Sequence, residues 1–351
     1  MRRRSPRRRR AVKIGIVLDG RRSAEEIAEL ARLAEESGIR QLWLSGGART
    51  KDHFLRLAVA ATRTRAIRLG PVAISPFEAH PARIALELLT LHEIAHGRGA
   101  IVLGGGGDFA ATLGVKLEGR VQAVEETLDI TRAVARGGEV NHQGRRFQVR
   151  GLFSPWTKLE PPPLYVGANR PRMIRMAAHR ADGVMFTDMP LVYVTSLVAE
   201  VRAGLLAAGR RPEDFRISNW FVWNVQDTPA EAFELASRQL GFRLYYVRDV
   251  AASIGLTEAE ARELERRQPE MLRAIFEGRD PWRPAPRLTE LLIRQLTLSG
   301  GRESLDDCVE RLLDFERRGV NEIALALHGD PSKAIRLLGE RVLPVVQNDA
   351  A

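Results

Sequence analysis

The sequence of 351 residues has a single cysteine, Cys308, and no uninterrupted apolar stretch that approaches 18 residues. One cysteine excludes an intramolecular disulfide and a metal site built from clustered cysteines, and it suits a reducing cytoplasm. Without a long apolar stretch, no segment is expected to cross a bilayer. The N-terminal region also lacks the apolar core of a secretory signal, because Lys13 and Gly15 interrupt it before Asp19. We therefore expect a cytoplasmic protein.

Excess positive charge is confined to one end of the chain. The formal net charge is +10, but residues 1–10 contain seven arginines, and the remainder carries 47 basic and 44 acidic residues. A nearly neutral body argues against a basic groove for nucleic acid across the folded domain. We expect residues 1–10 to form a disordered, arginine-rich tail, and we expect neither nucleic acid nor a membrane as a partner.

Short apolar runs alternate with longer segments of helical period along the rest of the chain, and 44% of all residues are apolar. This alternation is typical of a parallel β/α fold. A helix is expected after the first run, because Ser23 and Glu26 have the spacing of a capping box. The apolar runs predict eight strands, at residues 12–18, 41–44, 67–74, 100–103, 164–167, 182–186, 215–223 and 320–327.

Eight strands with intervening helices favour an α/β TIM (β/α)8 barrel, with a doubly wound sheet as the competing fold. The doubly wound sheet would require G-x-G-x-x-G after the first strand, and Asp19-Gly20-Arg21-Arg22 does not supply it. We expect one barrel domain over residues 11–347. Residues 137–149 read as a hairpin, and residues 242–298 break the β/α rhythm and are expected to form an insertion.

Glycine is concentrated where the fourth predicted strand ends, at Gly104–Gly107. In a TIM barrel the active site lies at the carboxyl ends of the strands, so this run would remove side chains from the barrel mouth and admit a flat ring. An ordinary loop is the alternative. Gly167-Ala168-Asn169 precedes a helix whose amides, with Arg170 or Arg172, could hold a phosphate. The alternative there is an Asn N-cap beside solvated arginines.

Few titratable residues lie at the predicted strand ends. Asp19 and Asp188 are candidate acids, although an Asp after a strand is commonly a turn residue or a cap. His80 begins the third helix and could donate to a ligand, or it could simply pack there. The histidines show no repeated metal spacing, so no metal site is expected. Ser45 and Ser75 lack the surroundings of a nucleophile elbow.

Three separated stretches carry a family resemblance: residues 69–82, residues 97–115 and residues 163–184. Together they resemble the bacterial-luciferase-like superfamily of flavin- or coenzyme F420-dependent TIM barrels, and most closely its methylenetetrahydromethanopterin reductase-like branch. The resemblance implies a non-prolyl cis peptide and a bulge near Val72-Ala73. It also implies a homodimer and a small-molecule substrate.

The resemblance further implies where a cofactor would lie. Val72, Ala73 and Ile74 would back its ring, and Asp19 or His80 would relay a proton. The remaining implied cofactor contacts are Gly106, Gly107, Asp108, Gly167, Ala168, Asn169 and Thr187.

The chain departs from the family pattern at Gly46, where an acidic residue often contacts the cofactor, and at Ala79, where the reductase branch often has Arg. We expect an oxidoreductase that passes a hydride between coenzyme F420 and a small organic substrate. Two alternatives stay open. One is a monooxygenase that uses reduced FMN and O2 and needs a partner flavin reductase. The other is a non-catalytic barrel that has lost its cofactor contacts.

Overall fold

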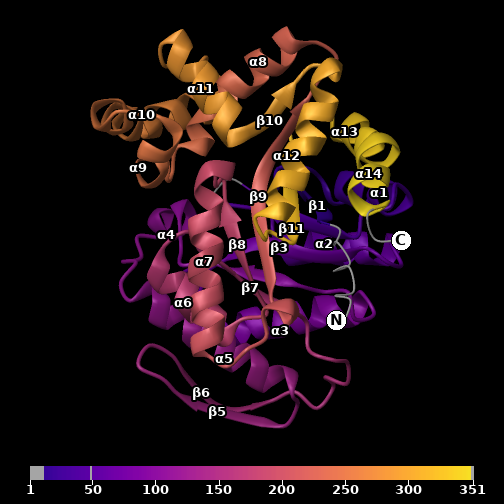
Figure 1. Cartoon of the computed structure of the whole chain (residues 1–351). Helices are drawn as coiled ribbons and strands as arrows, with labels where there is room; N and C mark the ends of the chain where they lie inside the picture. Colours follow the sequence, from indigo (N-terminus) through magenta and orange to yellow (C-terminus); the bar gives the residue numbers. More distant parts are fainter. Residues whose placement is uncertain (1–11, 48–49, 349–351) are drawn as a thin grey trace, which may run out of the picture.

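Eight parallel strands close into a barrel in the computed structural model, which describes residues 12–47 and 50–348 (Figure 1). The expected tail, residues 1–10, lies outside the described residues. The barrel order is β1-β2-β3-β4-β7-β8-β9-β11, and β11 pairs with β1. The strands are β1 (Lys13–Leu18), β2 (Gln41–Ser45), β3 (Arg68–Ile74), β4 (Ile101–Leu103), β7 (Leu164–Gly167), β8 (Gly183–Thr187), β9 (Arg216–Val225) and β11 (Glu322–Leu327).

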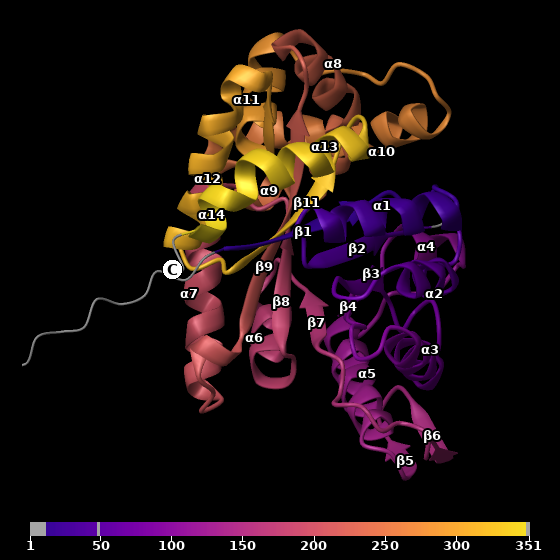
Figure 2. The same cartoon turned by 90° about the vertical axis from the view of Figure 1, so that its right-hand side faces the viewer.

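Helices surround this barrel, and Figure 2 shows α1, α2 and α3 stacked along one flank. The helices are α1 (Ala24–Glu36), α2 (His53–Arg63), α3 (Pro81–Ile94), α4 (Asp108–Thr112), α5 (Arg120–Ala135), α6 (Pro171–Arg180), α7 (Leu191–Ala207), α8 (Pro229–Gln239), α9 (Val247–Val250), α10 (Glu258–Phe276), α11 (Pro286–Leu296), α12 (Leu305–Arg317), α13 (Pro331–Leu337) and α14 (Leu343–Asn348). The TIM-barrel prediction is confirmed, and closure through the β8–β9 and β11–β1 pairs excludes the open doubly wound sheet.

Side chains fill the interior of the barrel. Trp43 and Tyr165 meet edge to face there, with ring centroids 5.4 Å apart. Two glycines make room for them: a Cβ on Gly70 would lie 2.7 Å from the Trp43 ring, and one on Gly183 would lie 2.7 Å from the Tyr165 ring. The barrel is therefore a packed core, and a ligand can enter only at its ends.

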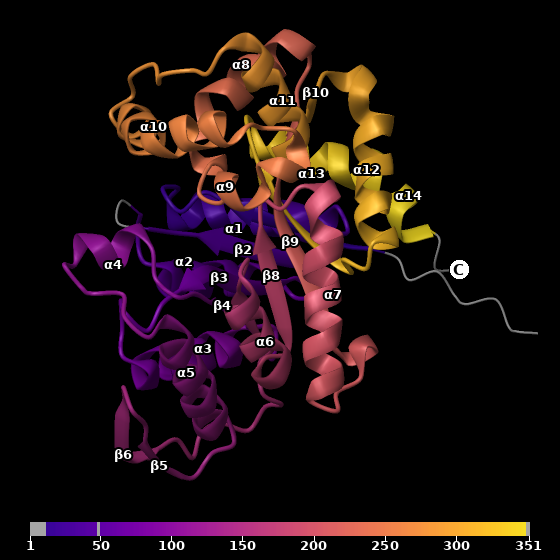
Figure 3. The same cartoon turned by 60° about the vertical axis from the view of Figure 1, so that its left-hand side comes forward.

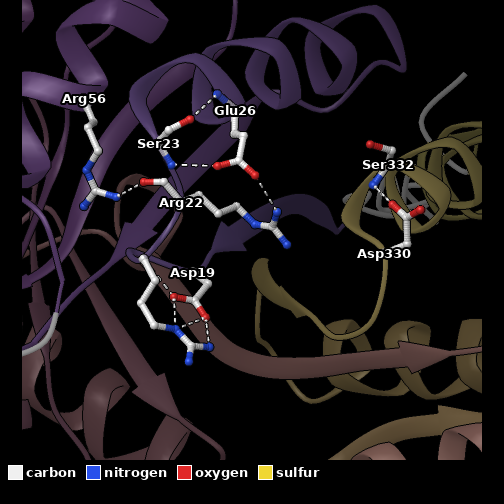
Figure 4. A network of polar contacts seen from close by, with 8 residues as sticks. Asp19, Arg22, Ser23, Glu26, Arg56, Asp330 and Ser332 are labelled. Carbon is white, nitrogen blue, oxygen red and sulfur yellow. Dashed lines mark hydrogen bonds and ion pairs between the residues drawn. The ribbon is translucent and has the colours of Figure 1, made fainter. Parts of the chain in front are cut away.

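Local sequence signals fix where several helices begin. Ser23 and Glu26 form the expected capping box on α1, with Ser23 Oγ accepting from the Glu26 amide and Glu26 accepting from the Ser23 amide (Figure 4). Asp52 caps α2 and Asp330 caps α13 with their side chains alone, which accept from amides of the first turn. Each cap satisfies amides that the first helical turn leaves free.

Two segments lie outside the regular β/α repeat. The expected hairpin is formed by β5 (Glu139–Gln143) and β6 (Gln148–Phe153), which lie beyond α5 at the lower end of the molecule in Figures 1 and 3. Residues 242–298, the expected insertion, contain α9, α10 and α11, and with α8 these helices gather at the upper end (Figure 3).

The chain leaves that segment along a strand that the sequence did not indicate, β10 (Thr297–Gly300). It pairs with Val222–Val225 of β9, next to the stretch of β9 that pairs with β8. Through this pairing, the segment that follows α8 rejoins the barrel sheet where the segment ends.

Candidate active site

A cavity of about 620 Å³ opens where the barrel strands end at their carboxyl termini. Its walls come from the ends of β2, β3, β4, β7 and β8 and from the segment after α8. Its size falls within the range of small-molecule and cofactor sites. The predicted position of the site, at the carboxyl ends of the strands, therefore coincides with an actual cavity.

Backbone forms one wall of the cavity, at Gly104–Gly107. A Cβ on Gly104 would lie 3.1 Å from the Cβ of Ala73, and one on Gly106, whose φ is +86°, would lie 2.6 Å from the Leu117 side chain. At Gly107 a Cβ would meet no atom within 4 Å. The wall therefore depends on glycine at Gly104 and Gly106, whereas Gly107 faces open space.

The end of β3 forms the adjoining wall. The peptide between Val72 and Ala73 is cis, and the register of β3 against β4 shifts between Val72 and Ile74. Both features were expected from the family resemblance and are confirmed. Ala73 and Ile74 line the cavity, whereas the Val72 side chain is buried in the barrel interior.

The ends of β7 and β8 contribute Gly167, Ala168 and Thr187 to the cavity. The buried Asn169 side chain joins these two strand ends, because its Nδ2 donates to the Thr187 carbonyl (3.2 Å) and its Oδ1 accepts from the Thr187 amide (2.9 Å). It is therefore not the N-cap of α6, a position that Arg170 holds. Asn169 supports the cavity wall through the main chain of Thr187.

His80 lies outside the cavity lining. Its Nδ1 accepts from the Ala82 amide at 3.2 Å, which makes it the N-cap of α3, and its ring packs edge to face on Phe147 at 5.6 Å. The sequence left open that His80 packs at the start of this helix, and in the structure it does so, with the capping bond in addition.

Asp19, which directly follows β1 as expected, is also outside the lining. The side chain and the amide of Arg21 donate to its carboxylate (Figure 4). Burial would raise the pKa of Asp19, but these contacts and the charge of Arg21 bring it below its usual value. A carboxylate held in this ionised, bonded form is a poor proton donor near neutral pH.

Asp108 and Arg170 closely follow the lining residues Gly107 and Ala168 in the chain, and Arg170 does not line the cavity. Asp108 is the first residue of α4, and its side chain lies outside what the structure describes. Arg170 donates to Asp249 of α9 at 3.2 Å. This bond joins the helix after β7 to the segment that covers the barrel mouth.

Glu78 is a titratable residue of the cavity that the sequence did not single out. It lies in the turn between β3 and α3, where its amide donates to the Ser75 carbonyl at 3.0 Å. Burial raises the pKa of its carboxyl from the usual 4.5 to about 7, and a hydrogen bond from the Ser75 backbone opposes that rise. A group with this pKa can both hold and release a proton near neutrality.

The departure from the family pattern at Gly46 has a structural counterpart in His53. A Cβ at Gly46 would lie 1.5 Å from Nε2 of His53, so the imidazole fills the volume that any side chain at this position would need. Burial, with the nearby charge of Arg56, lowers the pKa of His53. The neutral ring lines the cavity, but its Nε2 is buried without a hydrogen-bond partner among the described residues.

An ion pair anchors the segment after α8 to the barrel mouth. Arg243, which ends a short 3₁₀ helix (Leu240–Arg243), donates to Asp188 at 2.6 Å, and both side chains are nearly buried. Burial raises the pKa of Asp188 to about 6, and Arg243 opposes that rise. Next to Arg243, Tyr245 and Tyr246 reach the cavity, and burial raises the pKa of Tyr246, so its phenol stays protonated.

Neither a metal centre nor a membrane span is found in the part of the chain that the structure describes. Within residues 12–47 and 50–348, no three His, Cys, Asp or Glu side chains gather where a metal ion could bind. None of the helices in those ranges combines the length and the apolar character needed to cross a membrane.

The fold and the cavity define a TIM barrel with a ligand site at the carboxyl ends of its strands. Residues 11–322 match the family model described as luciferase-like monooxygenase, and the chain belongs to this family. The resemblance noted in the sequence is thereby confirmed. The chain is also 26% identical, over 91% of its own length and 95% of the relative's, to 5,10-methylenetetrahydromethanopterin reductase from Archaeoglobus fulgidus.

Two solved structures share the fold. The coenzyme F420-dependent tetrahydromethanopterin reductase from Methanopyrus kandleri superimposes with a TM-score of 0.80 at 22% identity, over 96% of this chain and 99% of that one. The FMN complex of the oxygenating constituent of 3,6-diketocamphane monooxygenase from Pseudomonas putida superimposes with a TM-score of 0.67 at 21% identity, over 95% and 98%.

The residues present fit a tricyclic cofactor ring. The wall of Gly104–Gly107 lacks side chains, and the adjoining wall at the end of β3 carries the small Ala73 and the apolar Ile74. A flat ring can approach such walls closely, because no side chain holds it away. The main chain at Gly106 lies at the same mouth and can serve polar atoms at the edge of a ring. The Ala168 amide already donates to the Met185 carbonyl at 3.0 Å.

Proposed function

We propose that the protein is an oxidoreductase that uses coenzyme F420 to transfer a hydride to or from a small organic substrate. The observation that carries this proposal is the backbone wall of Gly104–Gly107 beside Ala73 and Ile74, inside a cavity of about 620 Å³. Further support comes from the reductase relatives, since the solved reductase with the TM-score of 0.80 is described as F420-dependent.

In this proposal the chain binds and orients the ring. Ala73 and Ile74 back one face, whereas Val72, implied by the resemblance, is buried in the barrel interior. The main chain of Gly106, Gly107, Gly167 and Ala168, together with Thr187, forms the cradle. Asp108 follows Gly107 as the first residue of α4. Asn169 acts through Thr187 by holding β7 against β8. When bound, F420 supplies the hydride chemistry at its C5.

We assign the proton transfer to Glu78 in preference to Asp19 or His80. Glu78 lines the cavity and its pKa is about 7. Asp19 is ion-paired with Arg21, and His80 is bonded to the α3 amide of Ala82, outside the lining. Tyr246, held protonated by burial, lines the cavity from the segment after α8 and can donate a hydrogen bond to a substrate oxygen.

The oligomeric state and the location of the protein are two further properties that we propose. We propose a homodimer and a cytoplasmic location, the latter because the single Cys308 is a buried free thiol. Light scattering of the purified protein tests the first. A mass near 39.1 kDa, that of one chain, would contradict it.

The second candidate function is an FMN-dependent monooxygenase, which would need a flavin reductase to supply reduced FMN. It is favoured by one observation, the likeness to the FMN complex of a monooxygenase component. The same walls would hold either ring, because F420 and FMN share a tricyclic core.

Fluorescence titration of the protein with F420 and with FMN tests the two proposals. We expect F420 to bind at micromolar concentration and FMN more weakly. Gly107→Leu is the test variant, since a Cβ at this position meets no atom within 4 Å. It should weaken F420 binding at least about tenfold with an unchanged unfolding temperature. Tight FMN binding without F420 binding would favour the monooxygenase, and binding of neither would favour a barrel without a cofactor.

A further inference from the structure

Tyr246 lies between two ion pairs that join the segment after α8 to the barrel. Three residues before it, Arg243 donates to Asp188 at 2.6 Å, and three residues after it, Asp249 accepts from Arg170 at 3.2 Å. Tyr246 also starts α9, because its carbonyl accepts from the Asp249 amide at 3.0 Å. The chain is therefore attached to the barrel on both sides of this tyrosine.

The barrel residues of these two pairs lie beside residues that line the cavity. Asp188 directly follows Thr187, and Arg170 comes two positions after Ala168. The Asn169 side chain joins the two loops through the main chain of Thr187. The ion pairs thus connect the segment after α8 to the same strand ends that form one wall of the cavity.

The two pairs differ in their exposure to solvent. The side chains of Arg243 and Asp188 are 11% and 6% exposed, whereas those of Arg170 and Asp249 are 71% and 32% exposed. Attraction between charges is stronger where water is excluded, and an exposed pair contributes little. We therefore expect the buried pair, rather than the exposed one, to determine the position of the segment.

Arg243 depends on Asp188 for its counter-charge. In the part of the chain that the structure describes, Asp188 is the one carboxylate within ion-pairing distance of Arg243. His328 is a titratable neighbour, but burial lowers its pKa to about 3, and the charge of Arg243 acts in the same direction. His328 is therefore neutral and cannot replace the carboxylate, so the position of the guanidinium depends on Asp188.

Apolar packing also holds this segment on the barrel. Leu244, Val247 and Val250 are each 2% exposed or less, and they belong to the large hydrophobic core. Hydrophobic burial has no preferred direction, whereas a charge-assisted hydrogen bond fixes the donor against the acceptor. The core contacts therefore keep the segment in place, and the buried ion pair can determine how Tyr246 faces the cavity.

The Tyr246 phenol lies within electrostatic range of both pairs. Burial is the largest cause of its raised pKa, and the charges of Arg170, Asp249 and Asp188 also act on it. A movement of either pair therefore changes the surroundings of the phenol.

We propose that Arg243 and Asp188 are positioning residues of the active site, whose ion pair determines where the Tyr246 phenol lies in the cavity. Neither residue lines the cavity, so both act through Tyr246. The inference rests on the proposed function, in which this phenol donates to a substrate oxygen. A group with such a role has to be held within about 0.5 Å of its productive place by the residues that support it.

Fluorine NMR of the protein labelled with 3-fluorotyrosine tests the proposal without cofactor or substrate. The chain has four tyrosines, and Tyr246→Phe assigns the signal of Tyr246. We expect Arg243→Gln to shift this signal and to increase its difference between H2O and D2O, because the phenol gains contact with water. The signal of Tyr165, which is 1% exposed in the barrel interior, should stay unchanged and so report an intact fold.

Two further variants complete the test. Arg262→Gln removes an arginine from an exposed ion pair on α10 and should leave the Tyr246 signal unchanged. Asp188→Asn gives the answer if Arg243→Gln does not fold, because Asn keeps the shape of the side chain and tolerates the left-handed backbone at this position, where φ is +54°. It should shift the Tyr246 signal in the same direction. A Tyr246 signal that neither Arg243→Gln nor Asp188→Asn alters would overturn the proposal.

Addition of F420 separates this inference from the proposed function. In the unaltered protein F420 should shift the Tyr246 signal, because both lie in one cavity, and the shift should be smaller in Asp188→Asn. If F420 binds without any effect on Tyr246, the phenol is not placed at the ligand and the inference fails. If F420 does not bind at all, the proposed function fails, whereas the spectra without cofactor still decide whether the ion pair positions the phenol.

Discussion

Glu78 shows how one side chain can acquire chemistry from its surroundings alone. Its pKa in the folded protein, about 7, lies above the usual 4.5 because the cavity wall removes water from the carboxyl. Between these values the folded state binds more protons than the unfolded state. The contribution of Glu78 to the stability of the protein must therefore fall as pH rises from about 4.5 to about 7 and stay lower above that window.

Glu78→Gln should abolish this loss. A shift from 4.5 to about 7 corresponds to roughly 3 kcal/mol, and partial solvation reduces the expected effect to about 2 kcal/mol. Urea unfolding at pH 5 and pH 8 checks it: the unaltered protein should lose that much more stability than the variant between the two pH values. Glu340→Gln, at an exposed position, should behave as the unaltered protein does. Parallel pH curves for all three proteins would contradict the assignment.

Gly46 and His53 form a complementary pair, since the imidazole of His53 fills the volume that a side chain at residue 46 would need. Gly46→Ala should destabilise the protein by about 1–3 kcal/mol, because the ring must leave its place. In Gly46→Ala/His53→Ala the obstacle is gone, so the double variant should be more stable than the sum of the two single effects predicts. Urea unfolding of the four proteins gives the comparison, and strict additivity would show that the two positions do not compete for space.

At the scale of elements, the anchoring of the segment after α8 depends on Arg243 and Asp188. Arg243→Gln leaves a buried carboxylate without its cation, and the expected cost is about 3–5 kcal/mol. Arg262→Gln is the matched control, because Arg262 pairs with Glu258 on the exposed surface of α10 and such pairs contribute about 0.5 kcal/mol or less. Thermal unfolding of both variants, compared with the unaltered protein, measures these losses of stability. A similar small effect in both would mean that the buried pair does not hold the segment.

The strands of the barrel were predictable because each is a short apolar run bounded by a polar or glycine-rich stretch. β10 was not, since its four residues follow α11 directly and only its pairing with β9 identifies it. The strand with which β10 pairs lies far away in the sequence, and such a pairing produces no periodic pattern from which β10 could be predicted.

The candidate site was predictable at the level of the main chain and less so at the level of side chains. The glycine wall and the Val72-Ala73 segment carry local signals, namely a glycine run and a family-like stretch. The Arg243–Asp188 pair joins residues 55 positions apart, so no local pattern reveals it. Glu78 lacks a signal because its pKa depends on a cavity that exists only after folding.

At the scale of the whole molecule, the net charge of +10 belongs mainly to residues 1–10, with their seven arginines. Removal of these residues should leave cofactor binding and the unfolding temperature unchanged, because they precede β1 and the body is nearly neutral. Retention on heparin should fall sharply. Chromatography of both proteins at equal salt checks this, and unchanged retention would reveal a basic surface on the barrel itself.

The backbone wall of Gly104–Gly107 has a consequence for how such a protein can diversify. Every residue has the same main-chain atoms, so a substitution in this wall cannot change the groups that the main chain presents. It can only add a side chain that obstructs the cavity. Tyr245 and Tyr246 reach the same cavity from a segment outside the β/α repeat. Substrate preference can therefore change through that segment while the glycine wall is inherited unchanged, and the barrel mouth combines a conservative part with an adaptable one.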